Sequence, residues 1–151
     1  MIYDFGFTNY DFGFTNYDFG FRNYFLDEMI MTKTELMNRT KKFALDIILF
    51  VNSIPRNSIN SVLCSQLLRA GTSVAANYRA ALRAKSRADF IYKIKLIEEE
   101  ADESTFWLEL MRDSGLTYPE QLTSLFKEAD ELTAIFTQIG KTTKNRLSNK
   151  L

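Results

Sequence analysis

Apolar residues recur at alternating intervals of three and four over most of this 151-residue chain. This spacing places them on one face of an α-helix, whereas a half-buried strand needs an apolar residue at every second position. The pattern forms four stretches, which are separated by residues that end or begin helices, namely Pro55, Gly115 and Pro119. Four amphipathic helices with short links favour an all-α fold, an antiparallel up-and-down four-helix bundle.

The predicted helices begin at residues that cap a helix N-terminus. Thr32 and Glu35 have the spacing of a capping box at the start of the first helix. Ser58 caps the second helix, which should end near residues 83–85, and Ser86 caps the third. The residues predicted to face the common core are, in chain order, Leu36, Thr40, Phe43, Ile47, Phe50, Ile54, Ile59, Leu63, Leu67, Ala70, Val74, Tyr78, Ala81, Phe90, Ile94, Ile97, Ala101, Ser104, Leu108, Met111, Leu122, Leu125, Ala129, Leu132, Phe136 and Ile139.

The first thirty residues follow a different pattern. The segment YDFGFTN occupies residues 3–9, recurs unchanged at residues 10–16, and recurs at residues 17–23 with arginine in place of threonine. Its glycine disfavours helix, and its odd period turns the aromatic face of a strand over at each repeat, so no continuous sheet face results. We therefore predict a low-complexity, disordered N-terminal tail over residues 1–30 and a four-helix bundle domain over residues 31–151.

The composition removes several kinds of chemistry. Histidine is absent and Cys64 is the single cysteine, which excludes zinc fingers, Ser-His-Asp and Cys-His catalytic sites, and a disulfide framework. We expect no catalytic residue, no metal and no cofactor. The apolar run Ile47–Val51 is far too short to span a bilayer, which needs about 20 apolar residues. A reduced, cytoplasmic setting fits these features best.

Charge is unevenly distributed along the second and third helices. Bases dominate residues 69–95, where Asp89 is the one acid, and acids dominate residues 98–113, where Arg112 is the one base. A solvated helix surface with pairs such as Asp89 and Lys93 is the simpler explanation. A basic helix face of low relief would also suit nucleic-acid phosphates. The sequence contains no recognisable helix that would read nucleobases. The predicted nucleic-acid-binding residues are Arg69, Arg79, Arg83, Lys85 and Arg87.

The third helix carries a second apolar stripe away from its predicted core face. A helix that is apolar on two faces has to bury both, and a partner subunit is the simplest way to bury the second. Acids within the stripe would then meet bases of the next subunit, in a heterologous contact that can close into a ring. The predicted subunit interface consists of Tyr92, Leu96, Glu99, Glu103, Phe106, Trp107 and Leu110.

The stretch Gln66–Leu116 reads QLLRAGTSVAANYRAALRAKSRADFIYKIKLIEEEADESTFWLELMRDSGL. It resembles the central signature of the bacterial four-helix bundle proteins found in intervening sequences of 23S ribosomal RNA genes. The opening RTKKFALDII, residues 39–48, and the rhythm of the fourth helix are similar as well, so the likeness covers roughly residues 31–145. The family is related to the accessory protein of diversity-generating retroelements. The resemblance implies a ring-shaped homopentamer that binds nucleic acid through a basic surface and has no known catalytic centre.

The resemblance also assigns family positions to residues of this chain. The family's small–small–Asn segment falls on residues 75–77, and its run of acids and aromatics falls on residues 99–110. After the asparagine, residues 78–81 read Tyr-Arg-Ala-Ala where many members have an Ala-Glu-Gly turn, so the RNA specificity of other members is not transferred. The basic turn of the family falls on Arg79, Arg83, Lys85 and Arg87.

The leading interpretation is a non-enzymatic, homo-oligomeric accessory protein that binds RNA or DNA. One alternative is a protein–protein scaffold or adaptor with an unidentified protein partner and no nucleic-acid role. A remote alternative is a metal-dependent nucleotide hydrolase, since such helical enzymes hold Mg²⁺ between carboxylates of facing helices. Glu99 with Asp102 and Glu128 with Glu131 are the acids that this alternative would use, although Glu99 and Asp102 project about 60° apart on one helix.

The repeat tail provides a first test of the predicted domain boundary. Removal of residues 1–30 should leave helix content and thermal stability nearly unchanged, because the tail supplies none of the apolar positions of the four stripes. Circular dichroism melts of the full chain and of the truncated chain measure this. Loss of cooperative melting in the truncated chain would show that the tail belongs to the core.

Overall fold

The computed structural model describes residues 3–4, 31–115 and 119–148 of the chain. Two short strands, β1 (Tyr3–Asp4) and β2 (Met31–Thr32), pair in parallel. Residues 5–30, to which most of the predicted tail corresponds, lie outside the described residues. The helices are α2 (Lys33–Ser53), α3 (Ser58–Ala81), α4 (Arg87–Asp113) and α5 (Pro119–Ser148).

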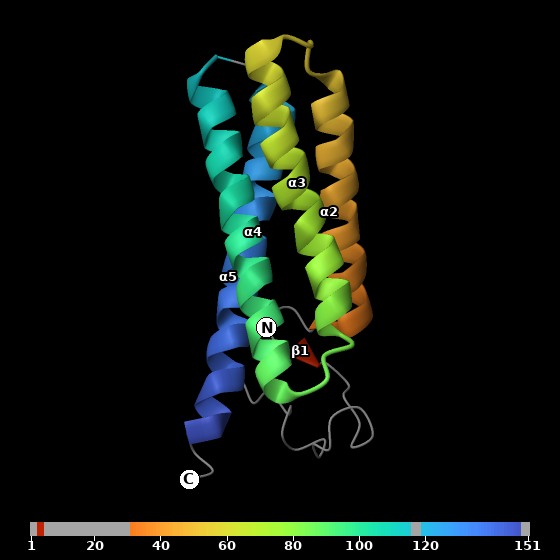
Figure 1. The fold of residues 1–151 in the computed structure, drawn as a ribbon, viewed down its shortest axis with the longest axis vertical. Coiled ribbons are helices and arrows are strands. Elements are labelled where there is room, and N and C mark those ends of the chain that lie inside the picture. The colour runs from red at the N-terminus through yellow and green to blue at the C-terminus, as the bar shows by residue number, and fades with distance from the viewer. Residues whose placement is uncertain (1–2, 5–30, 116–118, 149–151) are drawn as a thin grey trace.

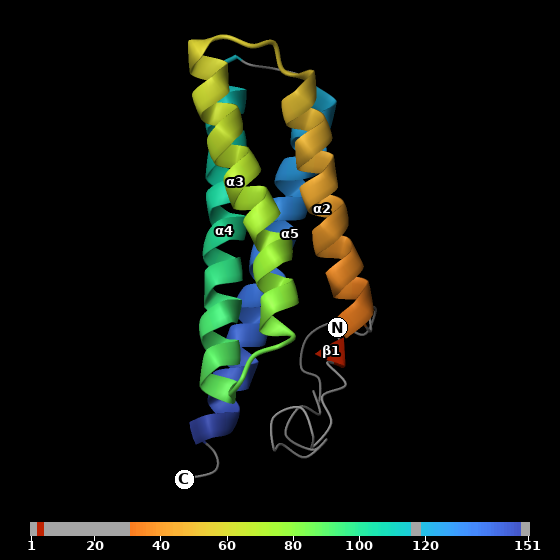
Figure 2. The same ribbon diagram turned by 45° about the vertical axis from the view of Figure 1, so that its right-hand side comes forward.

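The four helices lie side by side along one long axis, and each runs antiparallel to the one before it (Figures 1 and 2). In spatial order α2 packs on α3, α3 on α4 and α4 on α5, and the least extensive contact, between α2 and α5, completes the bundle. The predicted all-α four-helix bundle is therefore confirmed. Among the described residues, none of the helices has the length and apolar content needed to cross a membrane.

The helix ends follow the predicted capping signals in most places. Thr32 and Glu35 form the capping box, with the Thr32 amide donating to Oε2 of Glu35 at 2.6 Å. Ser86 caps α4, and Gly115 follows α4 with a φ of 76°, a left-handed conformation that favours glycine. The predicted cap at Ser58 is wrong by one residue, because Asn57 caps α3 by accepting from the amide of Asn60 at 2.8 Å.

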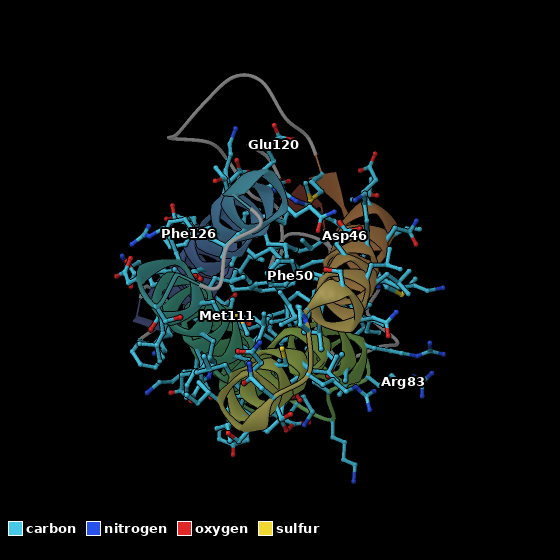
Figure 3. The ribbon with its side chains drawn as sticks, turned by 90° about the horizontal axis from the view of Figure 1, so that it is seen from above. Asp46, Phe50, Arg83, Met111, Glu120 and Phe126 are labelled. Carbon is cyan, nitrogen blue, oxygen red and sulfur yellow. The ribbon has the colours of Figure 1, made fainter. Side chains whose placement is uncertain are left out.

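The predicted core is confirmed at every position but one. The stripes of all four helices are buried between them, and Phe50 and Met111 point toward the centre of the bundle (Figure 3). Ile59 is the exception, because it is 67% exposed and Asn60 is buried instead. Asn60 lies closer to the middle of the core face of α3, and its side chain donates to the carbonyl oxygen of Pro55 at 2.7 Å, which offsets the cost of burying the amide.

Helices α2 and α3 are in close contact where Gly71 faces Ile47. A Cβ atom built on Gly71 would lie 2.1 Å from Cδ1 of Ile47. Ile47 is fully buried, so its side chain has no solvent to move into. Gly140 in α5 differs, because a Cβ atom there would lie 3.6 Å from Cγ2 of Ile94, an ordinary van der Waals distance. The absence of a side chain at position 71 therefore sets the spacing between α2 and α3.

Substitution of Gly71 by alanine should destabilise the bundle. Overpacking against Ile47 should cost about 3 kcal/mol, and the higher helix propensity of alanine should offset only about 1 kcal/mol of this. Urea unfolding followed by circular dichroism measures the net change. Gly140→Ala is the matched control and should be neutral or slightly stabilising. Equal stabilities of the two variants would contradict the close approach of α2 and α3 at Gly71.

Candidate nucleic-acid and subunit interfaces

Three of the predicted nucleic-acid-binding residues are exposed near the turn between α3 and α4. Arg79 lies in the last turn of α3, and Arg83 and Lys85 lie in the turn that follows it. Figure 3 shows Arg83 at the periphery of the bundle, pointing away from the central Phe50. None of the three basic side chains forms an ion pair with a described residue.

Asp89, the one acid among residues 69–95, already accepts two hydrogen bonds. Its carboxylate accepts from Nζ of Lys93 at 2.5 Å and from the backbone amide of Lys85 at 2.9 Å. The Lys93 hydrogen bond is the main reason that the pKa of Asp89 lies below its ordinary value. Asp89 therefore neutralises Lys93, and Arg79 and Arg83 form no ion pair with a described residue.

Further exposed bases lie in the same half of the bundle. The antiparallel order brings the start of α2, the end of α3, the start of α4 and the end of α5 to one end (Figures 1 and 2). A hydrogen bond of 2.8 Å from Nη2 of Arg87 to the carbonyl oxygen of Thr143 fixes the level of α5 there. We call the exposed bases of this half that form no ion pair with a described residue the basic end: Lys41, Arg79, Arg83, Lys85, Lys141 and Lys144.

Arg69 does not belong with these bases, although the sequence grouped it with them. Its guanidinium forms ion pairs across the seam between α3 and α4, with Glu103 and with Glu100, the latter at 3.4 Å. The indole Nε1 of Trp107 donates to the same Glu103 carboxylate at 3.0 Å. The Arg69 hydrogen bond, followed by that of Trp107, lowers the pKa of Glu103. Arg69 thus serves to join two helices of one chain.

Arg87 also differs from its predicted location, because it lies in the interior rather than on the basic surface. Its side chain is only 9% exposed. The guanidinium donates to the backbone of α5 at Thr143 and so ties the start of α4 to the end of α5. Arg87 and Arg69 therefore hold the bundle together, and the exposed residues of the predicted set that form no ion pair with a described residue are Arg79, Arg83 and Lys85.

The predicted subunit interface separates into exposed and packed residues. Tyr92, Phe106 and Leu110 are 62%, 51% and 39% exposed on the outer face of α4. Glu99 is exposed among them and lies 3.6 Å from Nζ of Lys95. The remaining residues are partly buried within the chain, since Trp107 packs against the core and both Leu96 and Glu103 are half-buried.

A second exposed apolar surface, on α2, was not predicted from the sequence. Leu45, Ile48 and Leu49 are 49%, 43% and 68% exposed there, and we call these three residues the α2 ridge. The segment from residue 43 to 51 is almost entirely apolar and therefore carries more apolar residues than one core face needs. This excess of apolar residues was the feature of the sequence from which the ridge could have been predicted.

The acids of the hydrolase alternative do not form a metal site. Glu128 and Glu131 of α5 both accept hydrogen bonds from Arg39 of α2, at 2.7 and 2.5 Å. Glu99 lies near Lys95 on the outer face of α4 instead of facing those two acids. Within the part of the chain that the structure describes, no group of three or more His, Cys, Asp or Glu residues could hold a metal ion.

Comparison with known proteins identifies similar sequences and structures. The family model described as 23S rRNA-intervening sequence protein matches residues 32–138, which include α2 to α4 and most of α5. The chain is also similar to the crystal structure of a protein of unknown function from the S23 ribosomal protein family of Bacteroides thetaiotaomicron. The two share 32% sequence identity and a TM-score of 0.67, over 72% of this chain and 97% of that one. No curated protein matches the chain.

The different environments of Arg87 and Lys85 lead to opposite expectations for two nearby substitutions. Arg87→Ala should lower the free energy of unfolding by about 2 kcal/mol, because it removes a charged donor from a buried carbonyl oxygen. Lys85→Ala should leave stability nearly unchanged, because the side chain is exposed. Urea unfolding of both variants checks this. Similar stabilities would show that Arg87 has no structural role.

Proposed function

We propose, since the chain belongs to the 23S rRNA-intervening sequence protein family, that it is a non-enzymatic, homo-oligomeric accessory protein that binds RNA or DNA. The protein contacts the phosphate groups of the nucleic acid rather than its nucleobases. The subunits associate through the exposed face of α4. The family resemblance implies five subunits. The basic end is the nucleic-acid surface.

The observation that carries this proposal is the unpaired state of the basic end. Among the described residues outside the basic end, exposed bases such as Arg69 and Arg112 lie against acids of the same chain, with Arg56 as the exception. Arg79 and Arg83 have no such acid among the described residues, although solvated helix surfaces usually intersperse both signs. Unpaired bases on several neighbouring elements favour a polyanionic partner, since each phosphate contact releases a condensed counterion.

Self-association supplies the affinity that one subunit lacks. The basic end of one bundle offers only a few phosphate contacts, which would give weak binding at physiological salt. A ring repeats the same bases in every subunit along one nucleic acid, so that the contacts combine as in other multivalent complexes. Tight binding is therefore expected only for the assembled protein, with little sequence preference and with a steep dependence on salt.

A protein–protein scaffold remains the second candidate function. It is favoured by the exposed apolar residues of α4 and of the α2 ridge, which can bind a protein without any nucleic acid. In that case the bases of the basic end would pair with acids of a protein. The two candidates differ in whether purified protein binds nucleic acid at low salt.

The double variant Arg79→Ala/Arg83→Ala should weaken nucleic-acid binding without changing assembly. Fluorescence anisotropy with a labelled single-stranded RNA and a duplex DNA, at several salt concentrations, gives both affinity and salt slope. We expect lower affinity and a slope that is shallower by about 1 for each phosphate that the variant no longer neutralises. Light scattering at the same protein concentrations should give an unchanged mass.

The matched control is Arg112→Ala/Lys127→Ala, which removes the same charge from exposed bases toward the other end of the bundle. It should affect binding much less. If the control weakens binding equally, the effect reflects net charge and not the basic end. If the unmodified protein binds neither nucleic acid at low salt, the proposed function is wrong and the scaffold role takes its place.

A further inference from the structure

The α2 ridge is an apolar surface with a depression on each side. Between α2 and α3 a groove of about 750 Å³ is lined by Ile48, Cys64 and Leu68 among others. Between α2 and α5 a smaller hollow of about 310 Å³ is lined by Leu49 and Phe50. A ridge between two hollows is a shape that complements protruding side chains of another helix surface.

The charges around the ridge are positive. Lys41 lies one turn before Leu45 on the outer side of α2, and Arg56 lines the groove beyond the other end of the ridge. Both are exposed and neither forms an ion pair with a described residue. Asp46, the acid that follows Leu45 on α2, forms an ion pair with Lys42, with 2.5 Å between Oδ2 and Nζ. The ridge therefore offers an apolar centre with unpaired bases at its two ends.

The exposed face of α4 has the opposite charge. Phe106 and Leu110 lie on it between Glu99, Asp102 and Glu109, all of which are exposed. The local bases compensate these acids only partly, since Glu109 lies 3.9 Å from Arg112 and Asp102 forms no ion pair with a described residue. This face therefore combines protruding aromatic and aliphatic side chains with an excess of negative charge.

We infer that the α2 ridge of one chain receives the exposed α4 face of a second copy. This inference rests on the self-association in the proposed function and names the surface that the α4 face binds. Phe106 and Leu110 fill the hollows beside the ridge, and the acids of α4 approach Lys41 and Arg56. Apolar burial supplies the affinity, and the opposite charges select the partner surface.

The charges also decide between this contact and a two-fold symmetric one. A symmetric pairing of two α2 ridges would bring the unpaired bases Lys41 and Arg56 near their own copies, and a symmetric pairing of two α4 faces would bring acids together. Like charges across an interface are unfavourable. Contact between different faces avoids both repulsions. Such a heterologous contact leaves one free ridge and one free α4 face at the ends until a ring closes.

The proposed contact uses Lys41 of the basic end and leaves its two arginines, Arg79 and Arg83, accessible. The close approach of Gly71 and Ile47 fixes the antiparallel level of α2 against α3. Arg79 then lies level with residue 39 of α2, roughly 9–15 Å along the axis from the ridge at 1.5 Å per residue, and Arg83, in the turn after α3, lies farther along in the same direction. A single protein can therefore use the ridge for assembly and the arginines for phosphate.

Two variants that each damage one face provide the test. Leu49→Asp places a charge in the ridge, and Phe106→Asp places one in the α4 face. Both positions are exposed, so that neither change should unfold the chain, which circular dichroism melts verify. Light scattering at micromolar concentration should show an oligomer for the unmodified protein and a mass near 17.5 kDa, that of one chain, for each variant alone. Ala134→Asp, at an exposed position of α5, is the matched control and should stay oligomeric.

An equimolar mixture of the two variants distinguishes the proposed contact from a symmetric one. The Leu49→Asp chain keeps an intact α4 face and the Phe106→Asp chain keeps an intact ridge, so the mixture should form a dimer with one chain of each kind. A mixture that stays monomeric overturns the inference, and so does a Leu49→Asp chain that stays oligomeric. Two milder changes at the ridge, Leu49→Ser and Lys41→Glu, should each reduce the mass in the same direction.

The outcomes separate this inference from the proposed function. If Phe106→Asp dissociates the oligomer but Leu49→Asp does not, self-association is supported and only the role of the α2 ridge is contradicted. If the unmodified protein is monomeric, both the ridge contact and the proposed homo-oligomer are contradicted. Nucleic-acid binding is measured separately on the arginine variants, so its failure does not change the interpretation of the mixing experiment.

Discussion

The antiparallel packing of four apolar stripes is the constraint on which the other features depend. Each helix has one continuous core face, and because the links between the helices are short, burial of all four faces in a common core makes neighbouring helices alternate in direction. The consequence extends to the polar residues. Bases near the end of α3, the start of α4 and the end of α5 are far apart or separated by acids in the sequence, yet the packing gathers them in one half of the molecule. The surface chemistry is thus a product of helix direction.

Sequence periodicity predicted the helices, their caps and nearly all of the core, because each of these depends on residues within a few positions of one another. The error at Ile59 shows the limit of that reasoning. The predicted apolar stripe of α3 began at Ile59. In the structure Asn60 is buried instead, because its side chain donates a hydrogen bond to a carbonyl oxygen in the preceding loop. A polar residue can take a core position whenever the fold brings it a partner, and periodicity carries no information about that partner.

The candidate sites were predicted only in part, for the same reason. A helical projection shows on which side of its own helix a residue lies, but it does not show what lies opposite at that level. Arg69 meets the acids of α4, Arg39 meets those of α5, and Arg87 meets a backbone oxygen. Arg79 of α3 and Arg83 of the turn after it lie at levels where no described acid forms an ion pair with them. The pairing of each arginine thus depends on its level along the bundle axis, which the spacing of residues within one helix does not specify.

The separation of charge along the bundle also affects how the molecule approaches a partner. The chain has equal numbers of acidic and basic residues, so at long range it is neither attracted nor repelled as a whole. A body with unpaired bases in one half and excess acid in the second half of α4 nevertheless experiences a torque in the field of a polyanion. Rotation therefore precedes attraction, and the molecule arrives with its basic half first. Because salt ions screen the field of the polyanion, this orientation acts mainly within a Debye length, about 8 Å at physiological ionic strength. Alignment is thus part of the final approach and not of the diffusional search.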